Sequence, residues 1–253
     1  MQTDRTPGSL PPRYQSVLTR VVVRDVTAVD DLLDLVRAEQ AEHPDVAVFV
    51  TLDQLDQALY TSMHATESDS LEISTDDLDF LEDPHADEVR ERRQLARTTA
   101  QLAAPDLRVA WSDLRGTLEG AEGDMEALVT VNDAPEGVLD DVLLVLHVPV
   151  ADPTAAIAGL PNGYFSEDWD VFQNHAVARH LAEGYGYRPL GTGASWVGFL
   201  RDQPLDPDRA TALVADLAEV YGFAGTPAWA RLADVLTRRT TLFLGYTGSF
   251  ADL

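Results

Sequence analysis

From residue 140 to the C-terminus the chain carries a regular succession of strand and helix signals, and this order most constrains its fold. β-Branched and aromatic runs predict strands, and apolar residues at helical spacing predict the helices between them. Three helix starts show an aspartate or threonine before a proline, a pair that caps a helix and suits its first turn. The predicted strands are 142–148, 187–190, 195–200 and 240–246, and the predicted helices are 153–159, 168–183, 207–221 and 227–237.

This order is that of a split βαβ, ferredoxin-like sandwich with extra helices at 153–159 and 227–237. We therefore expect an α+β fold with a ferredoxin-like C-terminal domain, residues 140–253, in which the last strand lies beside the first. The alternative is one continuous α+β domain in which the N-terminal strands extend the same sheet.

A smaller N-terminal region, residues 14–131, is predicted in β-α-β-α order. Strands at 17–23 and 46–50 are each followed by a capping-box pattern and apolar residues at helical spacing. Two further short strands are predicted at 107–111 and 128–131. Residues 1–13 are polar and rich in proline, which predicts a flexible arm.

An acidic insertion, residues 61–88, interrupts the N-terminal region. The chain has no lysine, no arginine occurs between residues 38 and 89, and the formal net charge is -25 at pH 7. Such a surface repels nucleic-acid phosphate and anionic lipid and attracts basic proteins. We therefore expect a basic protein partner, no direct contact with nucleic acid and no membrane contact. The predicted partner-binding residues are Asp69, Glu72, Asp76, Asp77, Asp79, Glu82 and Asp83.

Four arginines follow the insertion on a predicted helix, residues 88–104. Because arginine pairs so readily with nearby carboxylates, neutralising the acidic run within the fold is favoured over phosphate capture. The four are Arg90, Arg92, Arg93 and Arg97.

Residues 161–187 hold the candidates for a polar site. Asp170 and Asn174 fall on one face of a helix that is apolar on both sides, and His175 follows them. In one interpretation they line a pocket, with Asp170 as a base. In the other, Asp170 stabilises the helix N-terminus and Asn174 holds the preceding loop by hydrogen bonds. The second is favoured because the segment has no catalytic spacing.

Motifs for metal or cofactor chemistry are absent. The chain has no cysteine, and His175 and His180 are five apart, whereas the HExxH zinc pattern has its histidines four apart. D-x-D pairs such as Asp168 and Asp170 arise easily in a chain with so many aspartates. The glycine-rich stretch 191–195 lacks the lysine and following helix of a phosphate-binding loop, so it predicts a hairpin turn. We expect no metal and no cofactor, and an enzyme is the less favoured reading.

Residues 142–246 resemble an uncharacterised bacterial family, a domain of unknown function. The shared features are a strand, a helix ending near Tyr185 and Gly186, a glycine-containing hairpin, a proline-opened helix and a final aromatic strand. This resemblance implies a fold but no catalytic residues.

Together these observations predict an acidic, non-enzymatic interaction protein. It would bind and neutralise a basic protein, as an immunity or antitoxin-like protein or as a nucleic-acid mimic. One alternative is an enzyme or small-ligand binder using residues 161–187, and another is that the acidity is only an environmental adaptation. The chain shows no signal peptide and no run of roughly 20 apolar residues, so we expect a cytoplasmic protein. The oligomeric state stays open.

Overall fold

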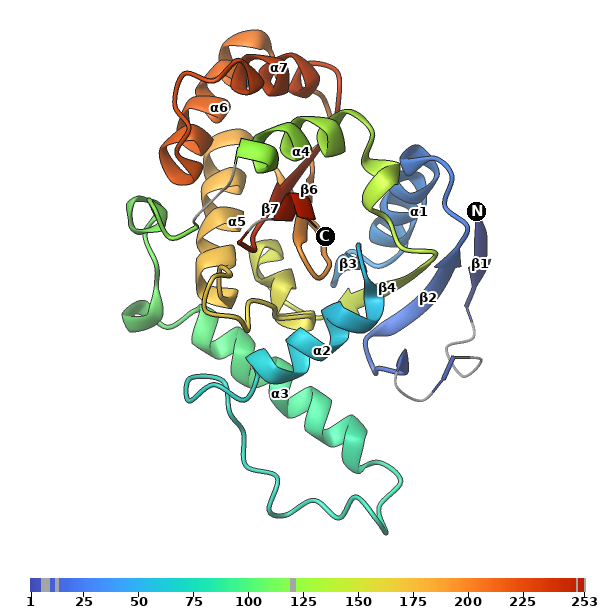
Figure 1. The fold of residues 1–253 in the computed structure, drawn as a ribbon. Coiled ribbons are helices and arrows are strands. Elements are labelled where there is room, and N and C mark those ends of the chain that lie inside the picture. Colours follow the sequence, from blue (N-terminus) through green and yellow to red (C-terminus); the bar gives the residue numbers. More distant parts are fainter. Residues whose placement is uncertain (6–9, 12–13, 119–121, 249, 253) are drawn as a thin grey trace.

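Seven strands form one mixed sheet in the computed structural model, which describes all residues except 6–9, 12–13, 119–121, 249 and 253. The order across the sheet is β1-β2-β4-β3-β5-β6-β7 (Figure 1). β3 and β5 are parallel, and every other neighbouring pair is antiparallel. The strands are β1 (Gln2–Asp4), β2 (Thr19–Arg24), β3 (Ala47–Thr51), β4 (Val142–Val148), β5 (Arg188–Thr192), β6 (Trp196–Leu200) and β7 (Thr241–Gly245).

Helices cover both faces of this sheet. Alternate strand residues point to opposite faces, so Val21 and Val23 of β2 join one apolar cluster and Val22 joins the other. The larger cluster also contains side chains of α1, α4, α5, α6 and α7, and the smaller one contains side chains of α2 and α3. The helices are α1 (Val29–Glu42), α2 (Leu55–Ala65), α3 (Ala86–Leu102), α4 (Glu122–Asp133), α5 (Val171–Tyr185), α6 (Pro207–Tyr221) and α7 (Pro227–Leu236), with short 3₁₀ turns at Pro105–Leu107, Trp111–Leu114, Pro135–Val138, Pro153–Gly159 and Phe250–Asp252.

The predicted α+β class is confirmed, but the ferredoxin-like strand order is not. β4 has a neighbour on each side, β2 and β3, so no edge of β4 is left for the last strand. The last strand, β7, pairs with β6 instead. Strands of both predicted regions therefore belong to one sheet, as in the alternative of a continuous α+β domain.

Two predicted short strands are wrong. Residues 128–131 lie inside α4, and residues 107–111 run from the end of one 3₁₀ turn to the start of the next. A short, mostly apolar run such as residues 128–131 does not distinguish a strand from a buried stretch of helix. In α4, Met125, Leu128 and Asn132 are buried at helical spacing, so packing of this face against the core favours a helix over a strand.

The structure also differs from the predicted flexible arm. Gln2–Asp4 forms β1 and pairs with the outer edge of β2, and Leu10 is buried in the smaller apolar cluster. Residues 6–9 and 12–13 of that arm lie outside the described residues. Among the helices that the structure describes, none combines the length and apolarity needed to cross a membrane.

Candidate functional site

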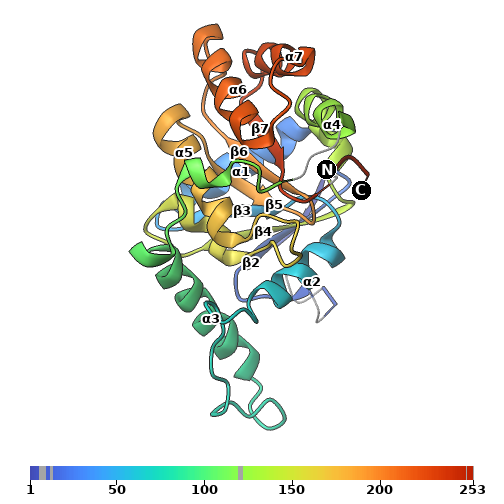
Figure 2. The same cartoon turned by 60° about the vertical axis from the view of Figure 1, so that its left-hand side comes forward.

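The segment between α2 and α3, residues 66–85, is called the acidic loop below. α2 fills the first part of the predicted acidic insertion, and α3 begins at its end. In two views, the acidic loop and the adjoining part of α3 project away from the body of the molecule (Figure 1 and Figure 2). The helices that cover the larger apolar cluster lie on other sides, so the described fold leaves this projection open to contact.

All seven predicted partner-binding carboxylates lie on the acidic loop and are exposed. Asp77 forms a two-bond ion pair with Arg93, at 2.6 and 2.7 Å, and this hydrogen bonding lowers the pKa of Asp77. In the part of the chain that the structure describes, none of the other six forms an ion pair. Most of the loop's negative charge is therefore not neutralised within the fold.

Local hydrogen bonds shape the acidic loop. Oδ1 of Asp79 accepts hydrogen bonds from the backbone N–H groups of Leu81 and Glu82, both at 3.0 Å. At the loop's start, Leu71 is buried and its carbonyl accepts a 2.9 Å bond from Gln94 of α3. Asp79 thus forms a turn of the kind that aspartate favours, and the loop is fastened to α3.

Two large apolar side chains are exposed within this acidic surface. Phe80 is 48% exposed and Leu81 is 97% exposed. Both stand beside carboxylates, at Asp79 and Glu82. Exposed apolar groups rimmed by polar ones are typical of interaction sites, so the loop carries both charge and apolar area for a partner.

The arginines of α3 neutralise only part of this surface. Arg92 pairs with Glu88 at 2.6 Å and Arg90 with Asp87 at 3.5 Å, besides the Arg93 pair with Asp77. The prediction that the arginines pair within the fold rather than remain available for phosphate is confirmed for these three. Their partners lie mainly on α3 itself, which leaves the carboxylates of the loop available.

Asp170, Asn174 and His175 have structural hydrogen bonds and do not share a cavity. Asp170 caps α5 by accepting 2.8 Å bonds from the N–H groups of Phe172 and Gln173. Asn174 is buried and donates to the carbonyl oxygen of Trp169 at 2.8 Å. These are the capping and loop-holding roles of the second sequence interpretation.

His175 is buried on the same helix, with Nε2 3.2 Å from the hydroxyl of Thr154. Burial lowers the pKa of His175 to about 4. A nearby cavity of about 650 Å³ is lined by Asp170 but by neither Asn174 nor His175. The three candidates are therefore not brought together for chemistry.

The glycine-rich stretch forms the predicted hairpin between β5 and β6, and a buried carboxylate holds it. Asp53, which follows β3, accepts bonds from the N–H groups of Ser195 at 2.9 Å and Trp196 at 3.3 Å. A Cβ on Gly193 would lie 1.8 Å from Oδ1 of Asp53, so only glycine fits. The hydroxyl of Tyr246 donates to the carbonyl oxygens of Gly193 and Ala194. Burial raises the pKa of Asp53 to about 6, and the sequence patterns did not identify this residue.

No family model, no curated protein and no solved structure matches this chain. The resemblance of residues 142–246 to a domain of unknown function therefore stays a prediction.

Proposed function

We propose that this chain is a non-enzymatic interaction protein whose acidic loop binds a basic protein partner. The proposal rests on two features that occur together on the acidic loop: exposed carboxylates without an ion pair and exposed apolar side chains. Six exposed carboxylates, which form no ion pair in the described part of the chain, lie on the same loop as the exposed side chains of Phe80 and Leu81. The proposal places the encounter in the cytoplasm.

Typical interaction free energies indicate different roles for the charged and the apolar side chains of the loop. An exposed ion pair contributes only about 0–1 kcal/mol to a complex, because solvent screens it. The carboxylates would therefore act mainly on the association rate and on partner choice, where steering can change the rate by about 10- to 1000-fold. Full burial of a leucine or phenylalanine side chain contributes about 1.5–3 kcal/mol, so Phe80 and Leu81 would supply much of the lasting affinity.

A partner that fits has an arginine- or lysine-rich surface around an apolar hollow. Two kinds of protein present such a surface: a cationic toxin, for which this chain would be an immunity or antitoxin-like inhibitor, and a nucleic-acid-binding protein, for which it would be a mimic of the phosphate backbone. In both cases the loop would cover the partner's working surface and neutralise it.

The test compares two variants that lose the same number of charges. The loop variant carries Asp76→Asn, Asp79→Asn, Glu82→Gln and Asp83→Asn, and the amide oxygens keep the loop's hydrogen-bond acceptors. The control variant neutralises exposed carboxylates elsewhere: Asp31→Asn, Glu42→Gln, Glu183→Gln and Asp208→Asn.

Each protein, with the wild type, is used to capture partners from native cytosol, and the bound proteins are quantified by mass spectrometry at low and high salt. We expect at least one basic protein to be captured by the wild type and by the control but depleted about tenfold with the loop variant. Equal capture by both variants would contradict the proposal and would fit acidity that is only environmental.

A further inference from the structure

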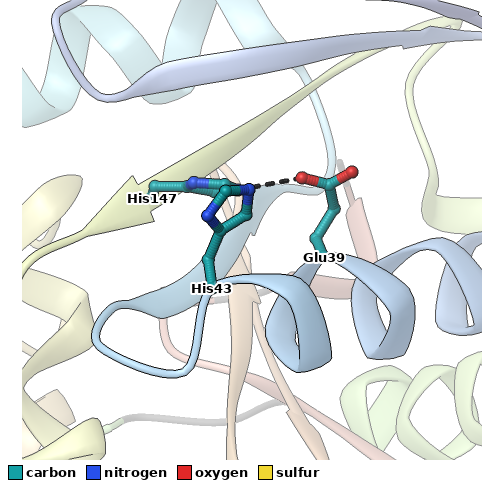
Figure 3. A group of neighbouring side chains, drawn as sticks. All are labelled: Glu39, His43 and His147. Atoms are coloured by element: carbon teal, nitrogen blue, oxygen red, sulfur yellow. Dashed lines mark hydrogen bonds and ion pairs between the residues drawn. The ribbon is translucent and has the colours of Figure 1, made fainter.

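A group of three potential metal ligands lies at the C-terminal end of α1, beside β4. Glu39 is in the last turn of α1, His43 follows that helix, and His147 is on β4 (Figure 3). Nε2 of His147 is 3.1 Å from Oε2 of Glu39, and the rings of the two histidines have centroids 4.6 Å apart. One ligand atom from each residue lies within 4.8 Å of the other two.

The fold, rather than a local motif, assembles this group. His43 follows Glu39 by four positions, so one helical turn brings both to the same end of α1. β4 lies beside β3, the strand that follows α1, and this pairing places His147 opposite Val48. Within the described part of the chain, no other three acidic, histidine or cysteine residues come together in this way.

The chemistry of the three side chains suits a divalent transition-metal ion. Two imidazoles and one carboxylate form the ligand set of many zinc sites and of the facial triads that hold Fe(II). Glu39 is 1% exposed and His147 is 7% exposed. Burial lowers the pKa of His147, although the hydrogen bond with Glu39 opposes this.

The surroundings of the group fit a site with open coordination positions. Arg5 donates to Oε1 of Glu39, which leaves Oε2 directed at His147 and fixes the carboxylate, as outer partners do in metal sites. The three residues also line a cavity of about 510 Å³, together with Arg20 and Arg92. An ion in this position would be reachable from solvent and would keep room for water or an anion.

Guanidinium groups near a cation site oppose binding, but two of them are already engaged. Arg5 donates to Glu39, and Arg92 pairs with Glu88. Arg20 directs a nitrogen at the carbonyl oxygens of Val17 and Thr19. The remaining positive charge favours an anionic ligand beside the metal rather than a second cation.

We propose that Glu39, His43 and His147 bind one divalent transition-metal ion, with Zn²⁺ as the ion of choice. Neither the acidic loop nor its partner takes part in this site. The metal-binding proposal therefore goes beyond the proposed interaction function and is tested independently of it.

The experiment is calorimetric titration of the full chain with Zn²⁺ in excess Mg²⁺. Mg²⁺ prefers oxygen ligands and occupies exposed carboxylates, whereas it competes poorly for imidazole. We expect one Zn²⁺ to bind with an affinity at least about a hundredfold above that of the His43→Ala variant, because loss of a direct ligand exceeds the 10- to 100-fold effect of an outer partner. His43 is half-buried at a helix end, so this variant is expected to keep the fold, which circular dichroism checks.

Two comparisons make the result decisive. His64→Ala is the matched control, since His64 is also paired with a glutamate, Glu67 at 2.9 Å, but has no second histidine in a metal-binding group. Co²⁺ in place of Zn²⁺ reports ligands through its visible absorption, which should be strong in the wild type and in His64→Ala and lost in His43→Ala and Glu39→Gln. Zn²⁺ affinity equal in wild type and His43→Ala, or a Co²⁺ spectrum unchanged by Glu39→Gln, would overturn the assignment.

Discussion

Replacing Asp53 by asparagine is expected to change how the stability of this protein depends on pH. Asp53 is 7% exposed, and burial raises its pKa from 3.8 to about 6 in the folded chain. Its two oxygens accept bonds from the N–H groups of Ser195 and Trp196, which oppose the shift but do not cancel it. The folded state therefore binds a proton at Asp53 more tightly than the unfolded state does.

The sign and the size follow from proton linkage. Because the folded pKa lies above the unfolded one, the stabilisation by the bound proton is fully present below about pH 3.8 and is lost as the pH rises through about 6. One pKa unit corresponds to about 1.4 kcal/mol, so the full effect is about 3 kcal/mol. About 2 kcal/mol of it falls between about pH 4.5 and about pH 7.5.

The assay is urea unfolding of the wild type and Asp53→Asn at several pH values in that window. Other groups, including Asp168 with its pKa raised to about 6 by burial, affect the pH dependence of stability equally in both proteins. Their contributions therefore cancel in the difference between the two. We expect the free energy of unfolding of the wild type to fall by about 2 kcal/mol relative to that of the variant as the pH rises through this window. If the difference in free energy of unfolding between the two proteins stays constant within about 0.5 kcal/mol at every pH, the reasoning that Asp53 carries a buried, destabilising charge is refuted.

Three further substitutions give separate checks. Leu81→Ser should leave the thermal midpoint unchanged, because the side chain is 97% exposed, yet weaken partner binding about tenfold or more in a kinetic binding assay. Gly193→Ala should lower the free energy of unfolding by more than about 2 kcal/mol in urea, since the new Cβ would overlap Asp53; a stable variant would show that the close approach is wrong. Tyr246→Phe should cost about 1–2 kcal/mol in the same assay, because its buried hydroxyl donates to two carbonyl oxygens; an unchanged stability would contradict those bonds.

Local signals predicted the C-terminal elements well. Asp206 and Gly222 bracket α6 as expected, because the aspartate caps the first turn and the glycine ends the helix with a positive φ of 78°. The strand order was not predictable in this way. The insertion of β3 between β4 and β5 depends on pairing between distant segments, and helical or strand periodicity carries no information on it.

Helix starts in the N-terminal half show the same limit. The capping-box patterns before α1 and α2 are not used, and distant carboxylates cap these helices instead. The N–H of Val29 donates to Glu136 at 3.1 Å, and the N–H of Leu55 donates to Asp140 at 2.7 Å. Both acceptors come from the chain around β4, so only the folded structure reveals them.

The two proposed sites differ in how far the sequence points to them. The acidic composition of the loop is plain in the sequence, whereas the exposure of Phe80 and Leu81 depends on how the loop leaves the body. For the metal-binding group, the spacing of Glu39 and His43 was a signal that could have been noticed. His147 could not have been joined to them, because it reaches the site only through the pairing of β3 with β4.

The most direct test of the interaction proposal places a photoreactive amino acid at residue 81 and, in a second protein, at residue 208 on α6, well away from the acidic loop (Figure 1). Both proteins are irradiated in native cytosol. The account predicts a salt-sensitive cross-link from residue 81 to a basic protein and none to that protein from residue 208. Cross-links from residue 81 to no protein, or to the same proteins that residue 208 labels, would contradict it.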